Sequence, residues 1–297
     1  MSSAMSTPRS DDVSAVVILL DVNPYFWGTK TSTGFTFEQF FQHVLVFINC
    51  ILLLSHLNQV TVIAMGASAC TFLYDSAAID GTASGRSKQD KQPESRSTTI
   101  THKLQEFVKK DEAAETNLGP VENQFSNLSG SLSMALCYIQ RILRKPTAPP
   151  QPRILCVQGF PDAPQQYIAV MNSIFSAQRC SVPIDACIVG SQHSAFLQQA
   201  SHITGGIYMK PPQPEGLFQY LMMVFATDLY SRQFLQLPRS AGVDFRASCF
   251  CHKRTIDMGF VCSVCLSIFC KHHKACSTCG ANFNVKKGGQ KRKHPSS

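Results

Sequence analysis

The chain has 297 residues, 44% of them hydrophobic and 15% charged, and this apolar content excludes a wholly disordered protein. Its net charge of +8 is confined to one end: residues 1–248 contain equal numbers of acidic and basic residues, whereas the last 49 carry nine basic residues against one acid, Asp257. Seven of the 13 cysteines also lie there, between Cys249 and Cys279. We therefore expect a neutral, apolar body followed by a small basic, cysteine-rich module.

Residues 1–12 are polar and contain no apolar stretch, so they do not resemble a secretory signal, and we expect them to be disordered. Without export, clustered cysteines are better explained as thiolate metal ligands than as disulfides. The chain contains no G-x-G-x-x-G, G-x-x-x-x-G-K-[ST], G-x-S-x-G or H-E-x-x-H motif. The commonest enzyme signatures are therefore missing from the sequence.

Residues 13–240 alternate short apolar runs with longer periodic segments, which predicts one α/β domain. In chain order, we expect strand Ala15–Leu20, helix Phe37–Leu57, strands Val60–Ala64 and Thr71–Tyr74, helix Leu132–Leu143, strand Ile154–Val157, helix Tyr167–Ala177, strand Ala186–Val189, helix Ser194–Ile203, strand Gly206–Met209 and helix Leu217–Leu235. Continuous apolar strands that alternate with helices indicate a doubly wound, mostly parallel sheet covered on both faces. The second and third strands are joined by only six residues, which predicts an antiparallel hairpin at one edge.

Two segments of this body stand out by their composition. The segment Val44–Leu54 is membrane-like but has about half of the ~20 apolar residues that a spanning helix needs. We expect it to belong to a fully buried core helix, with Thr36 as the N-cap, and we expect no membrane partner. The segment Asp80–Ser97 has no large apolar residue, which predicts a flexible surface loop.

Ligands of doubly wound sheets bind at the carboxyl ends of the strands, and here the first strand ends in Asp21, Asn23 and Tyr25. This strand, the strand order and the edge hairpin together resemble the von Willebrand factor A-type domain. In that family the first strand leads into Asp-x-Ser-x-Ser, whose oxygens hold magnesium together with a later Thr and an Asp after the fourth strand.

The match to that magnesium motif is incomplete. Asp21 fits, but Asn23 and Tyr25 occupy the serine positions, and Gln158 stands where the second acid would be. The loop before the Leu132 helix offers Gly130 and Ser131 instead of a Thr. One carboxylate with an amide is a thin ligand shell for magnesium, so we predict no magnesium at Asp21. We expect Asp21 and Asn23 to fix the loop by local hydrogen bonds, and the body to be a protein-binding scaffold without a small-molecule substrate.

The cysteine-rich module, residues 241–284, contains two C-x-x-C motifs separated by ten residues. Two such turns facing each other provide the four thiolates of a tetrahedral zinc site, which predicts Cys262, Cys265, Cys276 and Cys279 as zinc ligands. A site with four protein ligands is closed to water and supports folding, not catalysis. Because the segment has few apolar residues, zinc is expected to fold it.

Three further cysteines, Cys249, Cys251 and Cys270, permit a second zinc site in a cross-braced, RING-like arrangement. The fourth ligand of that site could be His252, His272 or His273. The alternative is that Cys249 and Cys251 are ordinary small apolar residues. Residues 285–297 form a basic tail, for which we expect disorder, a nuclear-import signal and at most weak or indirect contact with DNA.

A body of this type followed by CFCH, GFVCSVCLSIFC and CSTCG resembles the family of subunit three of general transcription factor IIH (TFIIH). The resemblance implies a non-catalytic structural subunit of the TFIIH core in the nucleus, acting in transcription initiation by RNA polymerase II and in nucleotide excision repair. It also implies a main partner, the larger von Willebrand A-type subunit, whose zinc domain docks against the body. The alternatives are a RING-like ubiquitin ligase, with the α/β domain recruiting its substrate, and direct nucleic-acid binding through the basic end.

Overall fold

The computed structural model describes residues 13–29, 35–77, 95–115, 125–144, 150–238, 243, 245–252 and 255–283. The chain divides into two compact units after Asp244. The polar N-terminus at 1–12, residues 80–94 of the predicted loop and the basic tail at 285–297 lie outside the described residues.

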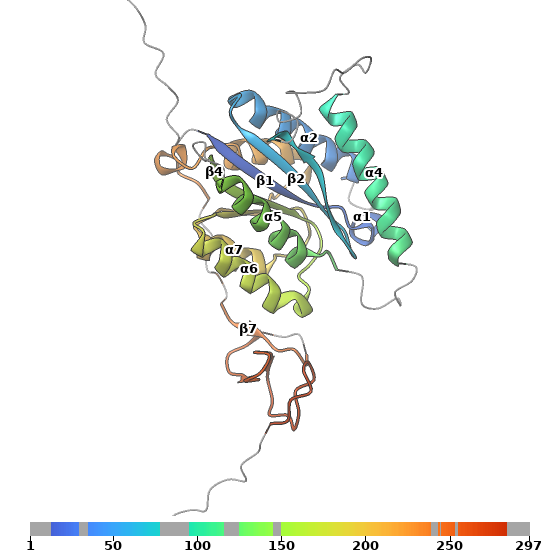
Figure 1. The fold of residues 1–297 in the computed structure, drawn as a ribbon, viewed down its shortest axis with the longest axis vertical. Helices are drawn as coiled ribbons and strands as arrows, with labels where there is room; N and C mark the ends of the chain where they lie inside the picture. Colours follow the sequence, from blue (N-terminus) through green and yellow to red (C-terminus); the bar gives the residue numbers. More distant parts are fainter. Residues whose placement is uncertain are drawn as a thin grey trace, which may run out of the picture. The chain divides into compact units, whose positions relative to one another are not determined.

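The first unit is built on a six-stranded sheet in the order β3-β2-β1-β4-β5-β6 (Figure 1). Its strands are β1 (Ser14–Asp21), β2 (Gln59–Met65), β3 (Cys70–Asp75), β4 (Gln151–Gln158), β5 (Ile184–Ile188) and β6 (Tyr208–Met209). All neighbouring strands pair in parallel except β2 and β3, which form an antiparallel pair at the edge. This confirms the predicted doubly wound sheet with an edge hairpin, in which the strand order reverses between β1 and β4.

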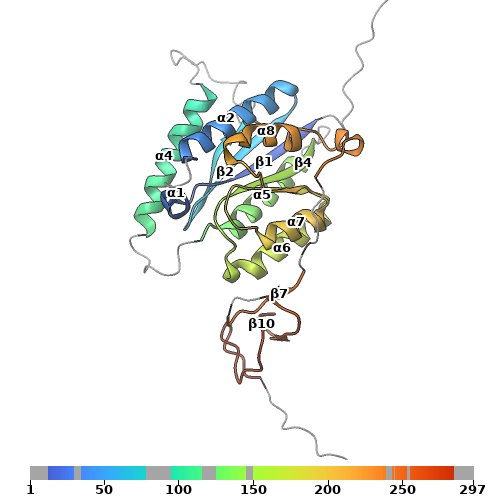
Figure 2. The same ribbon diagram turned by 180° about the vertical axis from the view of Figure 1, so that it is seen from behind.

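Helices cover both faces of the sheet, as Figures 1 and 2 show. They are α1 (Pro24–Thr29), α2 (Phe37–Leu54), α4 (Arg96–Glu115), α5 (Leu128–Leu143), α6 (Tyr167–Arg179), α7 (Ala195–Thr204) and α8 (Leu217–Tyr220), with short 3-10 turns at η3 (Pro164–Gln166) and η4 (Pro214–Gly216). Alternate side chains of β1 enter different cores: Val16 and Ile18 pack with α2, α4 and α8, whereas Val17 and Leu19 pack with α5, α6 and α7. Burial on both faces explains why the strand reads as one apolar run.

The helix α2 begins as predicted but is not fully buried. Thr36 forms a capping box with Gln39, and one side of the helix, including Phe40, Val44 and Phe47, packs on the sheet. By length and composition alone, α2 could cross a membrane. The prediction of a helix covered all round is wrong, because Leu53 and other apolar residues on its outer side face solvent.

The helix α4 was not predicted from the sequence, and Arg96 and Ser97, assigned to the flexible loop, form its first turn. Most of its side chains are polar, and its contribution to the core is the stripe of Ile100, Leu104 and Phe107, one helical turn apart. Near its end, Asp111 accepts hydrogen bonds from the backbone of the β2–β3 turn, including Ala67 N at 2.9 Å and Ala69 N at 3.1 Å. This capping carboxylate ties α4 to the hairpin.

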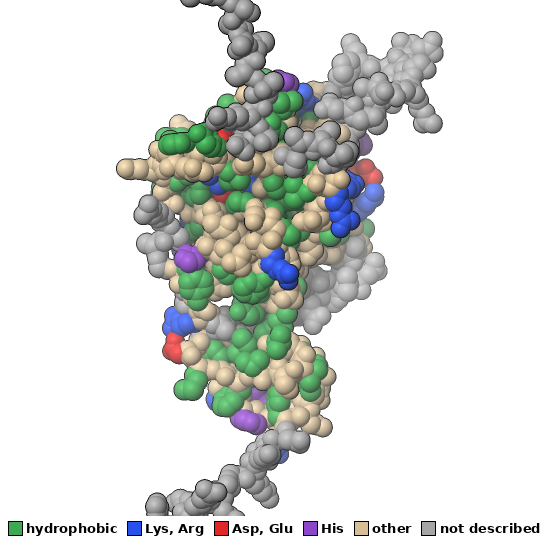
Figure 3. All heavy atoms as spheres, turned by 60° about the vertical axis from the view of Figure 1, so that its left-hand side comes forward, with side chains coloured by type: hydrophobic (Ala, Val, Ile, Leu, Met, Phe, Trp, Pro, Cys, Tyr) green, Lys and Arg blue, Asp and Glu red, His purple; other side chains and the backbone are tan. Residues whose placement is uncertain are grey.

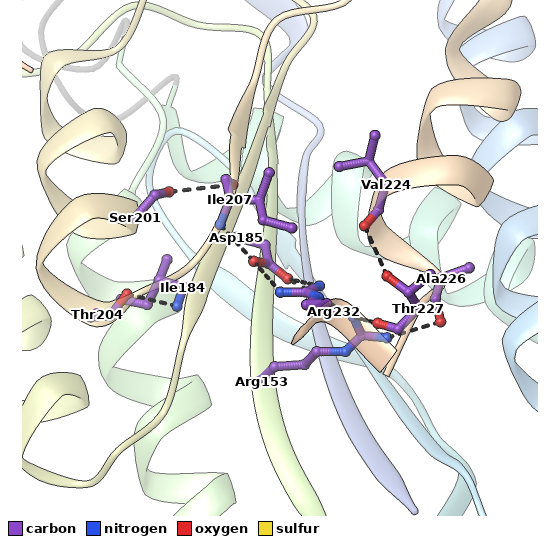
Figure 4. Close-up of polar contacts among 10 residues, drawn as sticks. All are labelled: Arg153, Ile184, Asp185, Ser201, Thr204, Ile207, Val224, Ala226, Thr227 and Arg232. Carbon is purple, nitrogen blue, oxygen red and sulfur yellow. Dashed lines mark hydrogen bonds and ion pairs between the residues drawn. The ribbon is translucent and has the colours of Figure 1, made fainter. Parts of the chain in front are cut away.

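The predicted helix Leu217–Leu235 is broken into α8, the π-helical turn η5 (Leu221–Phe225) and the 3-10 turn η6 (Ser231–Phe234). The break coincides with the buried Arg153 of β4, whose Nη1 donates to Thr227 O at 2.7 Å and whose Nη2 donates to Ala226 O at 3.4 Å (Figure 4). These hydrogen bonds hold the backbone at the point where the predicted helix is interrupted.

The same buried cluster anchors the segment that follows the break. Arg232 of η6 donates to both carboxylate oxygens of Asp185 on β5, at 2.9 and 2.6 Å, in the two-pronged geometry that favours Arg–carboxylate pairs. Asp185 also accepts from Ile207 N at 2.9 Å (Figure 4). Because the Ile207 N–H is used in this bond, it is not part of the sheet, and the predicted strand Gly206–Met209 is reduced to β6 at Tyr208–Met209.

The second unit has little regular structure. It contains two short antiparallel pairs, β7 (Ala247–Ser248) with β8 (Thr255–Ile256) and β9 (Phe260–Val261) with β10 (Ile268–Phe269). Its fully buried centre consists of Cys262, Phe269 and Cys276. With one large apolar side chain at its centre, this unit is too small to be stabilised by hydrophobic burial alone.

Candidate metal centres

The carboxylate of Asp21, at the carboxyl end of β1, is completely buried and is surrounded by hydrogen-bond donors. Its Oδ1 accepts from the Ser126 hydroxyl at 2.7 Å and from Asn23 N at 3.2 Å. Its Oδ2 accepts from Gly159 N at 2.9 Å and from Phe160 N at 2.8 Å. These bonds join the loops after β1 and β4 to the segment before α5, so Asp21 fastens three loops together.

Burial raises the pKa of Asp21 above its usual value of 3.8, and the four hydrogen bonds partly offset this effect. Both oxygens are engaged by donors of the protein itself. A magnesium ion would need those lone pairs and would have to displace the donors, so this geometry supports the predicted loop-fixing role for Asp21.

Two other residues expected around Asp21 make local contacts. Asn23 accepts from Tyr25 N at 3.0 Å, as a loop-fixing residue should. Gln158, at the position of the missing acid, donates to Phe160 O at 2.7 Å.

Gly130 and Ser131 were assigned to the loop facing Asp21, and this assignment is wrong because both lie inside α5. The residue that reaches Asp21 is Ser126, which the sequence reasoning did not single out. A signal was present: Asn127, a typical N-cap residue, accepts from Gly130 N at 3.0 Å and starts α5 at Leu128. Recognising this cap would have placed Ser126 in the loop.

The structure brings together the four cysteines of the two C-x-x-C motifs in the second unit. The ligand atoms of Cys262, Cys265, Cys276 and Cys279 all lie within 4.8 Å of one another. The Sγ atoms of Cys262 and Cys279 are 3.7 Å apart, and those of Cys265 and Cys276 are 3.5 Å apart. A tetrahedral zinc ion with Zn–S bonds of 2.3 Å has sulfur–sulfur edges of about 3.8 Å, so the arrangement fits zinc.

Two turns of the same design produce this arrangement. In the first, Cys262 N donates to Ser267 O and Leu266 N donates to Cys262 O, each at 2.9 Å. In the second, Cys276 N donates to Ala281 O at 2.8 Å and Gly280 N donates to Cys276 O at 2.9 Å. The Ser267 hydroxyl, 3.1 Å from Cys265 Sγ, lowers the pKa of that thiol to about 6, which favours the thiolate that zinc binds.

A second cluster consists of Cys249, Cys251, His252 and Cys270, whose ligand atoms also lie within 4.8 Å of one another. Cys270 Sγ is 3.4 Å from Cys251 Sγ and 3.1 Å from His252 Nδ1. Three thiolates and an imidazole are a common structural zinc set. All seven cysteines assigned from the sequence to the two sites therefore lie in clusters that could hold a metal ion.

The fourth position of the second cluster, left open by the sequence, is occupied by His252 in the structure. His272 and His273 lie among aromatic rings, with His272 5.3 Å from the ring of Phe260 and His273 5.2 Å from that of Phe269. Along the chain the two clusters interleave: Cys249 to His252, then Cys262 and Cys265, then Cys270, then Cys276 and Cys279. This is the cross-braced order.

Comparison with known proteins extends over both units. The family model described as transcription factor Tfb4 matches residues 13–280. The TFB4 subunit of general transcription and DNA repair factor IIH from Arabidopsis thaliana is 56% identical over 304 residues, which cover 100% of both chains. The chain belongs to the Tfb4 family. General transcription factor IIH subunit 3 of Dictyostelium discoideum is 42% identical over 274 residues, covering 89% of this chain and 73% of that protein.

The Tfb4 family assignment agrees with a solved structure. The N-terminal domain of TFIIH p34 is 27% identical and superposes with a TM-score of 0.54, covering 72% of this chain and 99% of that domain. Together with the strand order, this confirms a von Willebrand factor A-like fold for the first unit. The resemblance to TFIIH subunit three, based on the cysteine motifs and the altered magnesium motif, is also confirmed.

Proposed function

We propose that this Tfb4-family chain is a non-catalytic structural subunit of the TFIIH core, acting in the nucleus in RNA polymerase II transcription initiation and nucleotide excision repair. The observation that carries the proposal is the match to TFIIH subunits of the Tfb4 type along both units. The site at Asp21 supports a scaffold role, because its carboxylate is used to join loops and both of its oxygens are engaged.

In this proposal the second unit holds two zinc ions. Cys262, Cys265, Cys276 and Cys279 bind one, and Cys249, Cys251, His252 and Cys270 bind the other. Each set supplies four protein ligands, so neither ion has an open position for water and both serve folding. Measuring bound zinc is a direct test: two ions per chain are expected, and one or none would overturn the assignment.

The proposed main partner is the larger von Willebrand A-type subunit of TFIIH, whose zinc domain would dock against the first unit. The basic tail at 285–297 is proposed as a nuclear-import signal with weak or indirect DNA contact. Such contact would be electrostatic and would weaken steeply as salt increases.

The experiment that tests the function is affinity purification of the tagged full chain from nuclei, with the co-purifying proteins identified and quantified by mass spectrometry. Stoichiometric recovery of the TFIIH helicase subunits and the larger von Willebrand A-type subunit is expected. Recovery of the chain without them would overturn the proposed function.

A RING-like ubiquitin ligase is the second candidate, because the interleaved clusters are accompanied by exposed apolar residues. These are Val264 and Leu266, which lie in the first C-x-x-C turn, or knuckle, of Cys262 and Cys265. A conjugating enzyme would need such a surface. Discharge of ubiquitin from a panel of loaded conjugating enzymes distinguishes the two functions. We expect no acceleration by the zinc-loaded chain, and chain formation would favour the ligase.

A further inference from the structure

An apolar surface faces solvent at the end of the first unit where the parallel strands begin. Leu53 and Leu54 of α2 are 81% and 63% exposed, and Val46 and Leu57 are more than one-third exposed. Met223 of η5 is 75% exposed, and α8 with η5 lies beside α2 on the same face of the sheet (Figure 2). We refer to these five residues as the α2–η5 face.

The outer side of α2 and the turn after it carry this surface. Val46 and Leu53 are separated by a helical spacing of seven residues, so they project on the same side of α2, opposite the residues packed on the sheet, and Leu57 lies in the turn that follows the helix. This outer side is mixed, because Gln42 and Asn49 alternate with Val46 and Leu53 at helical spacing. Its exposed apolar residues gather toward the end of the helix at Leu53 and Leu54, where they have no partner in the hydrophobic clusters of the described residues. A patch of exposed apolar residues is typical of a surface that is covered in an assembly.

Charge is absent from the segments that form the face. No Lys, Arg, Asp or Glu occurs from Gln39 to Tyr74 or from Leu217 to Thr227. A helix that remains solvated normally carries charged residues opposite its buried side. Figure 3 shows hydrophobic side chains on the surface of the first unit, mostly among side chains of other uncharged types and with few acidic or basic ones between them. A charged partner would lose its hydration here without gaining a counter-charge.

A cavity of about 390 Å³ adjoins the face. Leu54 and Met222 form its apolar side, and Arg153, Thr227 and Asp228 line its polar side. Arg153 is 1% exposed, and its buried Nε has no hydrogen-bond acceptor within the described part of the chain.

The charges around this cavity are balanced. Arg153 and Arg232 are matched by Asp185 and Asp228, so the cavity has no excess charge to attract a charged group. Its polar side, with Ser14, Thr227 and Asp228, suits an uncharged polar side chain such as an amide or a hydroxyl.

We propose that the α2–η5 face docks an uncharged, amphipathic helix of another TFIIH subunit, which buries its apolar side on the leucines and inserts one amide or hydroxyl side chain into the cavity beside Arg153. This inference rests on the proposed function, because the partner is a subunit of the same factor. A lipid surface fits less well, since the face has no Lys or Arg to attract anionic headgroups.

The test compares hydroxyl-radical footprints of the full chain alone and in purified TFIIH. Leu53, Met222 and Met223 are expected to be modified at least tenfold less in the complex than in the free chain. If the chain is recovered with TFIIH but these residues are modified equally in both samples, the docking surface is overturned and the proposed function stands. If the chain is not recovered with TFIIH, both are overturned.

Variants provide a second measurement. The double variant Leu53→Glu, Leu54→Glu places charges on the face without removing buried side chains, and we expect at least a tenfold loss of retention in TFIIH. Gln105→Glu, at an exposed position of α4, is the matched control and should keep full retention. Thermal melting of each purified chain checks that the fold is kept. Full retention of the double variant would overturn the inference.

The same samples distinguish two other possible partners of the α2–η5 face, a second copy of this chain and a lipid surface. Footprint protection in the free chain that increases with its concentration would indicate a second copy of this chain and would overturn the inference. Binding to phosphatidylcholine vesicles that is lost in the double variant, while TFIIH retention is kept, would indicate a lipid surface and would also overturn it.

Discussion

Leu266 and Gly280 occupy equivalent positions, each following the second cysteine of its knuckle, and both have a left-handed backbone conformation. Their φ angles are +61° and +73°. Glycine adopts this conformation without steric strain, whereas a side chain with a Cβ is strained by roughly 1–2 kcal/mol. Leu266 is mostly exposed, so its side chain gains little from packing. The first knuckle is therefore strained where the second is not.

Substitutions at these two positions should have opposite effects on the second unit. We expect Leu266→Gly to make zinc removal by a chelator harder by about 1 kcal/mol, roughly a fivefold shift in the midpoint. Gly280→Ala should make removal easier by a similar amount. Chelator titrations followed by the zinc content of the chain measure both. Equal shifts in the same direction would contradict the strain argument.

At Asp21, the raised pKa has a consequence for stability at mildly acidic pH. A carboxyl whose pKa is higher in the folded state than the unfolded value of 3.8 keeps its proton to a higher pH in the folded state. Its contribution to the free energy of unfolding therefore falls as pH rises from 3.8 to the folded pKa, and it is constant above the folded pKa. Because asparagine does not titrate, we expect the free energy of unfolding of Asp21→Asn to increase relative to that of the unmodified chain as pH rises through this interval. Urea unfolding at a series of pH values measures the difference.

The control for this prediction is Glu112→Gln, which changes an exposed carboxyl on α4. Its difference from the unmodified chain should vary little with pH. A difference between Asp21→Asn and the unmodified chain that stays flat across the same interval would show that burial does not raise the pKa of Asp21.

Among the elements, the ion pair between Asp185 and Arg232 holds η6 against the sheet. Both side chains are nearly inaccessible, and removing one partner leaves a buried charge, which typically destabilises a protein by about 3–5 kcal/mol. We expect Asp185→Ala to lower the free energy of unfolding of the first unit by roughly this amount, measured by denaturant unfolding. Arg141→Met, which removes a 70% exposed partner 3.8 Å from Asp75, should change it by less than about 1 kcal/mol.

The elements also show how far the sequence could predict this fold. Strand positions and the edge hairpin follow from apolar runs, because strands buried on both faces leave a continuous pattern. The helix α4 was not recognised, since four large apolar residues in 20 give little periodic signal. The break after η5 coincides with hydrogen bonds from Arg153, 73 or 74 positions from the carbonyls that it binds, and no local pattern encodes such a contact.

The candidate metal centres also contain residues that the sequence could predict and residues that it could not. Cys262, Cys265, Cys276 and Cys279 could be grouped from the sequence because the ligand spacing is a local property of each knuckle. The choice of His252 over His272 and His273 could not be made, because it depends on which side chains pack against Phe260 and Phe269. Ser126 contacts Asp21 across 105 positions of the chain.

At the scale of the whole molecule, the two units differ in what stabilises them. The first has two large cores, whereas the second has Phe269 and its cysteines. We expect Cys262→Ser or Cys276→Ser to unfold the second unit and leave the cooperative melting of the first unit unchanged, as measured by calorimetry and hydrogen exchange. Cys137→Ser, at an exposed position of α5, is the control and should change neither. Loss of melting of the first unit in the zinc-ligand variants would mean that the units do not fold separately.

The interleaved clusters also set an order of events during synthesis. The last ligand of one cluster is Cys270 and that of the other is Cys279, in a chain of 297 residues. A growing chain cannot close these clusters until Cys270 and Cys279 have been added, whereas the strands and helices of the first unit are made before them. During that interval the nascent protein carries a first unit able to fold and a second unit whose cysteine clusters are still incomplete.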